Sequence, residues 1–365
     1  MKSTLWLPLA GFLIHASSLL AHAEAPPCSP DDLYQERVGF GAQATGGDPG
    51  HVYHVTTLAD TGGPGSLRAA TSSDEKFWIV FDVSGTIQLQ KSLRIKSNKT
   101  LDGRHSDIAI VGEIRIDAGV QNVILTDLTI SNPDPNGPAA GDAIGVRGHA
   151  GATFEAYDTR DLWFNHLNIF RSTDGLLDVR GGTNITVSWS HFHTHDKAML
   201  VWDDTDTKPA PEMRLTLHHN YFQEITRRSP QVSYGKADFF NNFSYHWYEF
   251  AAASIQGAQL LSENNIYEAR SGIACLWPCP DPNSPTHDSD FMVSKKAVVF
   301  EWSNPELGNV RSVGDRLDQG AKVQSRNPEA VFRRSDYYPA NLEIADDSLR
   351  NRIVSGAEPR KSSCL

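Results

Sequence analysis

Helix-forming stretches, long apolar runs and basic charge are all in short supply in this sequence. Amphipathic segments of helical period are scarce, and beyond the first 23 residues no apolar run is long enough to cross a bilayer. Only 33 Lys and Arg residues face 44 Asp and Glu residues, which gives a formal net charge of −11. Because nucleic-acid binding needs a basic surface, the acidic charge argues against a nucleic-acid partner. The absence of a long apolar run argues against a membrane span. An anionic ligand would have to be bound by local cations within an acidic protein.

Cysteine is also sparse, with four residues in a chain of 365. They are Cys28, Cys275, Cys279 and Cys364. Four cysteines allow three disulfide connectivities, and spacing alone favours Cys275–Cys279 together with Cys28–Cys364. Without a second close pair or clustered histidines, a zinc site is not expected.

The first 23 residues have the features of a secretory signal peptide. Lys2 is followed by an apolar run from Leu5 to Leu20 and then by Ala21-His22-Ala23, which fits a cleavage site between small residues. We therefore expect a secreted, extracellular protein, in which disulfides can persist. The remaining residues, 24–365, are expected to form a single domain.

Short alternating β segments recur along the middle of the chain. Examples are Asn184-Ile-Thr-Val-Ser-Trp189 and Met213-Arg-Leu-Thr-Leu-His218. The last apolar positions of six such segments are separated by 39, 23, 30, 23 and 22 residues, and they are Ile130, Ile169, Phe192, Phe222, Tyr245 and Tyr267. A period of 22–23 residues with two longer intervals predicts an all-β fold, a right-handed parallel β-helix with loop insertions. A leucine-rich repeat is the main alternative, but the spacing of Leu and Asn does not match it.

The repeats also predict what lies between and beyond the coils. Asparagine and histidine recur at one phase, so we expect side-chain ladders at the bends from His219, Asn220, Asn241, Asn242, Asn264 and Asn265. Ser66 is a suitable N-cap for a short helix, and this N-terminal region is expected to cap the open end of the coil. From about Pro278 the period fades, which predicts a C-terminal tail along the coil.

Charged residues between positions 174 and 230 follow an order that indicates a site. Asp174-Gly-Leu-Leu-Asp178 places two carboxylates four residues apart, on the same face if the segment is a strand. Carboxylates held side by side repel each other, and a bound cation is the usual compensation. Lys197 and Arg228 follow, and we expect them to meet an anionic substrate rather than those acids. Arg227 points the other way in an extended segment, so we expect it to be structural.

A series of motifs extends from about Val38 to Glu268 in one order. They are Val38-Gly-Phe-Gly, Gly65-Ser-Leu-Arg68, Trp78-Ile-Val-Phe81, Lys99-Thr-Leu-Asp-Gly103, Gly141-Asp-Ala-Ile144, Leu162-Trp-Phe-Asn-His166, Asp174-Gly-Leu-Leu-Asp178, His195-Asp-Lys-Ala-Met-Leu200 and Arg228-Ser-Pro230. Each is weak alone, but together they make the chain resemble the pectate lyases of the first polysaccharide lyase family. The resemblance implies the right-handed parallel β-helix and an enzyme that acts on polygalacturonate or pectin.

The resemblance also implies roles for five residues. The family's calcium ligands map onto Asp142, Asp174 and Asp178, which are hard oxygen donors of the kind that Ca²⁺ requires. Arg228 matches the catalytic base, and Lys197 matches the lysine that holds the substrate carboxylate. The implied reaction is Ca²⁺-dependent β-elimination in α-1,4-linked polygalacturonate, giving unsaturated oligogalacturonates. We expect the protein to act as a monomer.

Five positions depart from the family pattern. Ser233 stands where typical members have a second arginine that contacts the substrate, so restoring an arginine there is expected to tighten substrate binding. Ala140 replaces a further aspartate that some members have, and Asn165 replaces an aspartate in a WIDH-like segment. Val201-Trp202 replaces a Leu-Gly pair.

Three other functions stay open on the sequence alone. Asp174 and Asp178 could be the acid and base of a glycoside hydrolase on the same architecture, which would leave Lys197 and Arg228 without a role. A pectin lyase-like enzyme acting on methylated pectin would not need calcium, and the three retained acids argue against it. The third is a non-catalytic β-helix that binds a cell-wall polysaccharide.

Overall fold

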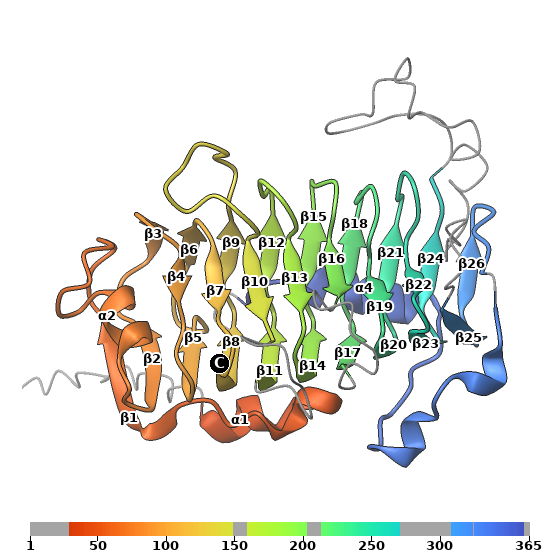
Figure 1. Cartoon of the computed structure of the whole chain (residues 1–365), viewed down its shortest axis with the longest axis horizontal. Coiled ribbons are helices and arrows are strands. Elements are labelled where there is room, and N and C mark those ends of the chain that lie inside the picture. Colours follow the sequence, from red (N-terminus) through yellow and green to blue (C-terminus); the bar gives the residue numbers. More distant parts are fainter. Residues whose placement is uncertain (1–28, 149–158, 203–212, 271–307, 324, 361–365) are drawn as a thin grey trace, which may run out of the picture.

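Three parallel β-sheets run along the length of the computed structural model, which describes residues 29–148, 159–202, 213–270, 308–323 and 325–360 (Figure 1). From β2 onward, successive strands belong to different sheets, and each sheet pairs strands from neighbouring coils. This is the parallel β-helix that the repeat predicts. The expected signal peptide and all four cysteines lie outside the described residues. No helix in the described ranges is both long enough and apolar enough to span a membrane.

We name the sheets A, B and C. Sheet A contains β1 (Asp48–Val55), β2 (Phe77–Phe81), β5 (Lys99–Asp102), β8 (Gln121–Thr126), β11 (Arg160–Asn165), β14 (Thr183–Ser188), β17 (Arg214–His218), β20 (Lys236–Phe240), β23 (Gln259–Glu263) and β25 (Asn309–Val313). Sheet B contains β3 (Gly85–Gln88), β6 (Ile108–Val111), β9 (Thr129–Ser131), β12 (Asn168–Phe170), β15 (His191–His193), β18 (Tyr221–Gln223), β21 (Phe243–Tyr245), β24 (Ile266–Glu268) and β26 (Arg316–Asp318). Sheet C contains β4 (Leu93–Arg94), β7 (Ile114–Ile116), β10 (Ile144–Arg147), β13 (Leu177–Arg180), β16 (Met199–Trp202), β19 (Gln231–Ser233) and β22 (Ala253–Ile255).

The core lies inside the coil and is built from residues that point inward from all three sheets. In sheet C, Ile144, Leu177 and Met199 form one buried column across β10, β13 and β16. Alternation with period two turns the intervening residues outward. Burying an aliphatic side chain of this size contributes about 1.5–3 kcal/mol. That burial is complete only when a coil rests on its neighbours, so the coils stabilise one another.

Sheet B confirms the spacing found in the sequence, with one slip. The register partners across β9, β12, β15 and β18 are Ile130, Ile169, Phe192 and Phe222. The next partner is Ser244 rather than Tyr245. Phe243 and Tyr245 instead pack outward, in an apolar cluster with the C-terminal helix α4 (Asp347–Gly356). The small residue therefore points inward, which an apolar pattern alone does not reveal.

The prediction of a tail beginning at Pro278 is wrong for residues 309–318. There β25 pairs with β23 and β26 pairs with β24, so the chain forms one more coil. The period fades in the sequence because 40 residues, 269–308, separate β24 from β25. Beyond β26 the chain does run back along the coil, as predicted.

At the bend that leads from sheet A to sheet B, three of the six residues predicted for side-chain ladders form one, whereas His219, Asn241 and Asn264 bond Glu343 of the C-terminal tail. Asn220 Nδ2 donates to Asn242 Oδ1 at 2.9 Å, and Asn242 Nδ2 donates to Asn265 Oδ1 at 3.0 Å. The ladder ends on the last coil, where Asn265 donates to Asp315 Oδ1. All four side chains are buried or nearly so, and the ladder satisfies their polar groups from coil to coil.

Short helices lie at the N-terminal end of the coil and along its outside. The helix α2 (Leu67–Ser72) begins after Ser66, whose hydroxyl accepts from the N–H of Ala69, and packs at the end where β1, β2 and β4 lie (Figure 1). The other elements are α1 (Pro30–Gln35), η1 (Phe40–Gln43), η2 (Pro328–Ala330) and η3 (Arg334–Asp336). Leu349 and Ile353 of α4 pack on an outward apolar row of sheet B, formed by Tyr221, Phe243 and Ile266.

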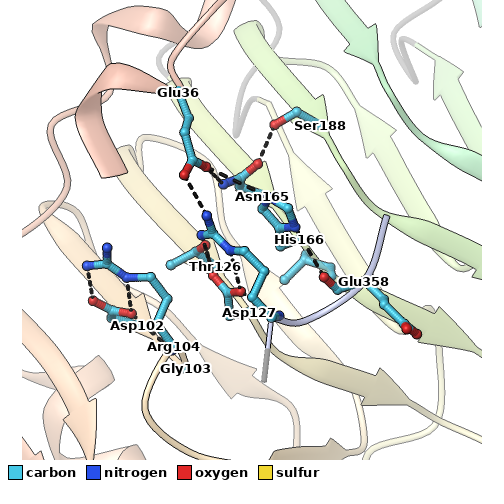
Figure 2. A network of polar contacts seen from close by, with 12 residues as sticks. Glu36, Asp102, Gly103, Arg104, Thr126, Asp127, Asn165, His166, Ser188 and Glu358 are labelled. Atoms are coloured by element: carbon cyan, nitrogen blue, oxygen red, sulfur yellow. Dashed lines mark hydrogen bonds and ion pairs between the residues drawn. The ribbon is translucent and has the colours of Figure 1, made fainter. Parts of the chain in front are cut away.

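Two ion pairs, each with a buried aspartate, fasten the C-terminal tail to the coil. Arg360 donates from Nε and Nη2 to the two carboxylate oxygens of Asp127 at 2.9 and 2.8 Å, and from Nη1 to Glu36 Oε1 at 2.5 Å. Figure 2 labels the two acceptors, Asp127 and Glu36. Arg334 makes a similar two-pronged pair with Asp238 at 2.5 and 2.6 Å. We call these pairs the tail clamps. They join residues that are 233 and 96 positions apart in the chain.

Candidate active site on sheet C

Sheet C and the turns leading into it hold all five residues singled out in the sequence. Asp142 lies just before β10, Asp174 lies just before β13, and Asp178 is the second residue of β13. Lys197 precedes β16, and Arg228 precedes β19. Since β10, β13, β16 and β19 are neighbours in this order, the five residues occupy four consecutive coils.

Hydrogen bonds between these coils fix the carboxylates. Lys197 donates from Nζ to Asp174 Oδ1 at 2.6 Å. The backbone N–H of Gly175 donates to Asp142 Oδ1 at 3.0 Å, and a backbone N–H of β16 donates to Asp178 Oδ1 at 3.1 Å. The expectation that Lys197 stays apart from the acids is therefore wrong for this structure, since it is paired with Asp174.

The four-residue spacing predicted that Asp174 and Asp178 lie on the same face of one strand, and this prediction is wrong. The segment is not extended throughout, because Gly175 is held in a turn by its bond to Asp142 and β13 begins only at Leu177. The Asp174 side chain is 46% exposed, whereas that of Asp178 is 3% exposed. The spacing thus gives one carboxylate at the surface and one that is buried.

Burial and charge move the three carboxyl pKa values apart. Burial, followed by the charge of Asp142, raises the pKa of Asp178 to about 7. Burial also raises the pKa of Asp142, with the charge of Asp174 acting in the same direction. At Asp174 burial acts upward too, but the bond and charge of Lys197 outweigh it and lower the pKa. The buried pair, Asp142 and Asp178, therefore carries negative charge that its neighbours compensate incompletely.

Two arginines that the sequence analysis missed face these acids. Arg147 Nη2 lies 3.8 Å from Asp142 Oδ2, and Arg180 Nη2 lies 3.8 Å from Asp174 Oδ2 and 3.9 Å from Asp178 Oδ2. Both arginines follow a buried apolar residue near the end of a strand, which is the signal that could have marked them as outward-facing.

Arg228 lies on the same side, with its backbone in the left-handed region at φ 63°. The prediction of an extended segment is therefore wrong at this residue. Arg227 nevertheless has the structural contacts expected of it, since it pairs with Asp196 at 3.0 Å and Glu249 at 3.3 Å. Burial, and then the adjacent charge of Arg227, lower the pKa of Arg228.

Two further residues hold the backbone around the acids. The buried Asn132 donates from Nδ2 to the carbonyl oxygens of Gly141 and Asp142 at 3.0 and 3.1 Å. His195 donates from Nε2 to the carbonyl oxygen of Asp174 at 2.6 Å. Neither was singled out as a site residue, because a backbone-holding role leaves no distinctive spacing in the sequence.

Two departures from the family pattern prove to be neighbours. Val201 and Val232 are register partners, which places Trp202 beside Ser233 on the outward face of sheet C. Ser233 is nevertheless fully buried, and Trp202 packs edge-on against Tyr234 with ring centroids 6.1 Å apart. An arginine at position 233 would therefore meet a covered site.

A third departure from the family pattern, Asn165, lies next to the tail clamp of Arg360. It donates from Nδ2 to Glu36 Oε2 at 2.9 Å and accepts from Ser188 at 2.7 Å (Figure 2). Glu36 also accepts from Arg360, so the change from Asp to Asn removes a negative charge from a structural cluster and leaves the site untouched.

The carboxylates here supply the hard oxygen donors that a divalent cation requires. A Cβ on Gly145 would lie 3.2 Å from Glu113 Oε1, 3.4 Å from Asp142 Oδ2 and 4.0 Å from Arg147 Nη2, so two carboxylates and a guanidinium group border the space beside this glycine. A Cβ on Gly175 would meet Asp178 Oδ1 at 2.3 Å. Among the described residues, no three acidic, histidine or cysteine side chains already converge around a metal position.

Comparison with known proteins agrees with this architecture. The family model described as pectate lyase matches residues 82–278. A pectate lyase from Nicotiana tabacum is 34% identical over 312 residues, which cover 82% of this chain and 75% of the relative. The crystal structure of jun a 1, the major allergen from cedar pollen, has a TM-score of 0.68 at 25% identity, covering 89% of this chain and 93% of that one. A pectate lyase from Bacillus sp. N165, solved in complex with trigalacturonate, has a TM-score of 0.58 at 20% identity, covering 88% and 98%.

Proposed function

This chain belongs to the pectate lyase family of polysaccharide lyases, and we propose that it cleaves α-1,4-linked polygalacturonate by β-elimination, with Ca²⁺ as cofactor. The product would be an unsaturated oligogalacturonate. The signal-like N-terminus supports export, and an exported enzyme would meet the polymer outside the cell.

Arg228 is the proposed base that removes the proton from C5 of the uronate. An arginine can do this only in its neutral form, which is rare at neutral pH. Burial and the charge of Arg227 both favour that form by lowering the pKa of Arg228. We therefore expect an alkaline optimum.

Lys197 is the proposed contact for the carboxylate next to C5. In this structure its ammonium group bonds the exposed Asp174, so a substrate carboxylate could replace one anionic partner with another. Stabilising the charge that develops on that carboxylate makes the C5 proton easier to remove.

Asp142, Asp174 and Asp178 are the proposed calcium ligands. A bound Ca²⁺ would supply further positive charge to the substrate carboxylate. The raised pKa of Asp178 supports a cation there, since burial and Asp142 leave its negative charge poorly stabilised by protein groups alone.

The observation that carries the proposal is the placement of Arg228, Lys197 and the three acids on four consecutive coils of one sheet. The decisive experiment incubates the protein with polygalacturonate, with and without a calcium chelator, and follows ultraviolet absorbance. Only elimination creates a conjugated double bond, so hydrolysis or mere binding would give no signal. Faster turnover of highly methylated pectin, unaffected by chelator, would instead support a pectin lyase.

A further inference from the structure

An ion-paired cluster of three residues adjoins the two cationic residues of the candidate site. Arg227 donates from Nη2 to Asp196 Oδ2 at 3.0 Å and from Nη1 to Glu249 Oε2 at 3.3 Å. These residues lie on three consecutive coils, in the turns that precede β16, β19 and β22. The side chains of Asp196 and Glu249 are 21% and 13% exposed, so solvent screens the two ion pairs less than it screens pairs at an open surface. We call Asp196, Arg227 and Glu249 the Arg227 cluster.

Two members of the Arg227 cluster are chain neighbours of proposed active-site residues. Lys197 follows Asp196, and Arg228 follows Arg227. Lys197 and Arg227 are also partners in an isolated parallel β-bridge. In this bridge the N–H of Arg227 donates to the carbonyl oxygen of Asp196 at 2.9 Å, and the N–H of Ala198 donates to that of Arg227 at 3.2 Å. The side-chain ion pair and the backbone bridge therefore join the same two turns, at the positions that carry Lys197 and Arg228.

The backbone of Arg228 has a conformation that needs such support. Its φ of 63° lies in the left-handed region, which a residue other than glycine keeps only where the surrounding structure enforces it. The N–H of Met199 donates to the carbonyl oxygen of Arg228 at 2.7 Å, which ties this residue to the preceding coil. The N–H of Glu249 donates to the carbonyl oxygen of Thr226 at 2.8 Å, from the following coil. The Arg227 cluster adds side-chain bonds to both of these coils.

In the proposed reaction, Lys197 and Arg228 act on the same sugar ring. Lys197 holds the carboxylate attached to C5, and Arg228 removes the proton from that carbon. A base must lie within hydrogen-bond reach of the proton that it removes, and a displacement of about 1 Å can lower a rate about a hundredfold. The separation of the two turns therefore matters more for turnover than for substrate affinity.

We propose that Asp196, Arg227 and Glu249 are positioning residues, which set the separation of Lys197 and Arg228 across two coils. The inference rests on the proposed function, because it assumes that Arg228 is the base. Arginine suits this role, since its planar guanidinium group bonds two carboxylates at once in fixed directions. A lysine ammonium group keeps the charge but lacks this fixed geometry.

The test compares Arg227→Gln, Arg227→Lys, Asp196→Asn and the double variant Asp196→Asn with Arg227→Gln against wild type. Arg316→Gln is the matched control, because Arg316 also bridges two carboxylates, Asp318 at 2.9 Å and Asp347 at 2.7 Å. The Arg316 side chain is 31% exposed, against 32% for Arg227, and it belongs to sheet B rather than sheet C. Each protein is measured for kcat and KM on polygalacturonate, the pH dependence of kcat, trigalacturonate affinity by calorimetry, and melting temperature.

We expect Arg227→Gln to lower kcat about tenfold to a hundredfold, while trigalacturonate affinity changes less than twofold. Arg227→Lys keeps the charge beside Arg228, so its pH dependence should match wild type, but its kcat should recover only in part. Asp196→Asn should also lower kcat. The double variant should be no slower than Arg227→Gln, because both changes break the same ion pair. Arg316→Gln should match wild type in kcat and KM.

Three results would overturn the positioning role. Wild-type kcat in Arg227→Gln, with a lower melting temperature, would show that the cluster only stabilises the fold. Full recovery of kcat in Arg227→Lys would show that only the charge beside Arg228 matters. Multiplicative losses in the double variant would show that Asp196 and Arg227 do not act as a unit.

Two further outcomes are separated by the same measurements. If Arg227→Gln does not fold, kcat in Asp196→Asn and Arg227→Lys decides, and wild-type values in both would refute the positioning role. Absence of unsaturated product from the wild-type protein would refute the proposed function and the positioning role together. Equal turnover by wild type and Arg227→Gln would refute the positioning role alone.

Discussion

The tail clamps and the candidate site both combine arginines with aspartates, but the arginines differ in how completely their N–H groups are hydrogen-bonded. In the clamp at Asp127, Arg360 makes two hydrogen bonds of 2.8 and 2.9 Å to one carboxylate. In the site, Arg180 stays 3.8 to 3.9 Å from its two carboxylates and keeps a buried nitrogen without a partner in the described structure. Saturated pairs hold two parts of the chain together, whereas an unsaturated cluster has bonding capacity left for a third component.

The pKa values of the buried aspartates Asp127 and Asp178 also distinguish the clamp from the site. At Asp127 burial acts upward, but the bonds and charge of Arg360 outweigh it and lower the pKa. At Asp178 burial and the charge of Asp142 prevail, and the pKa rises to about 7. Two buried aspartates in one protein therefore have opposite effects on its stability.

The largest effect is expected when an arginine is exchanged for lysine, once in the site and once in a tail clamp. Arg228→Lys should lower kcat by about a hundredfold to ten-thousandfold, the range typical of losing a general base, because lysine keeps the charge but not the planar guanidinium. Arg360→Lys should instead lower the melting temperature and leave kcat on polygalacturonate unchanged. Near wild-type turnover in Arg228→Lys would remove Arg228 as the base.

The second prediction compares two aspartate-to-asparagine exchanges at pH 8 with chelator present. Asp127→Asn should lower the free energy of unfolding by about 1.5–3 kcal/mol, because it removes the charge from the acceptor of two charge-assisted hydrogen bonds, although Arg360 keeps Glu36 as a partner. Asp178→Asn should raise the melting temperature, since it removes a buried charge that the fold stabilises poorly. Destabilisation of similar size in both variants would show that the two clusters are energetically alike.

The pH dependence of these two variants gives a further check. The folded pKa of Asp178, about 7, exceeds its ordinary value of 3.8, so its ionisation destabilises the fold increasingly as pH rises from about 4 to 7. The advantage of Asp178→Asn should therefore disappear near pH 4. The pKa of Asp127 is lowered, so its contribution is present above pH 3.8 and is lost as pH falls through the lower folded value. Thermal unfolding from pH 3 to 9 measures both trends.

Calcium affinity should respond only to the site. Asp174→Asn and Asp178→Asn should each weaken Ca²⁺ binding about tenfold and shift the calcium dependence of activity to higher concentration, because each removes one unit of negative charge from three acidic ligands. Asp127→Asn serves as the control and should bind Ca²⁺ as wild type does. Calorimetry showing unchanged affinity in both site variants would exclude these residues as ligands.

The smallest effect concerns Ser233. The sequence predicted that Ser233→Arg tightens substrate binding, but Ser233 is fully buried beside Trp202. We now expect less than a twofold change in KM for the single variant. The double variant Trp202→Gly with Ser233→Arg should lower KM further than either change alone, because glycine leaves room for the guanidinium. Additive effects in a double-mutant cycle would show that the two positions are independent.

The coil was predictable because its signal is local and repeated. Alternation places Ile130, Ile169, Phe192 and Phe222 in one row, and the asparagine phase predicts the ladder. Two features were mispredicted because their causes lie outside the repeat: Ser244 instead of Tyr245 points inward, and residues 309–318 form a further coil. In the first case an outer helix covers two aromatic residues, and in the second a long interval hides the period.

The site was predictable in its members but not in its contacts. Resemblance to a family selected Asp142, Asp174, Asp178, Lys197 and Arg228, and all five lie in sheet C or in the turns leading into it. Their pairing depends on turns, such as the one at Gly175 that keeps Asp174 out of β13. Arg147 and Arg180 were missed because no shared motif includes them, and only the strand register shows that they stand side by side.

The tail clamp at Asp127 also determines at which stage of synthesis the early coils can be fastened. A solenoid held only by contacts between neighbouring coils can stack from its N-terminal end while it is being synthesised. Here the bond partner of Asp127 is Arg360, 233 residues later. A nascent chain can therefore stack its early coils but cannot make this ion pair until residue 360 has been synthesised. Shortening the chain before residue 360 should leave stacked coils that lack this ion pair, so the early coils are fastened only after the later coils have been made.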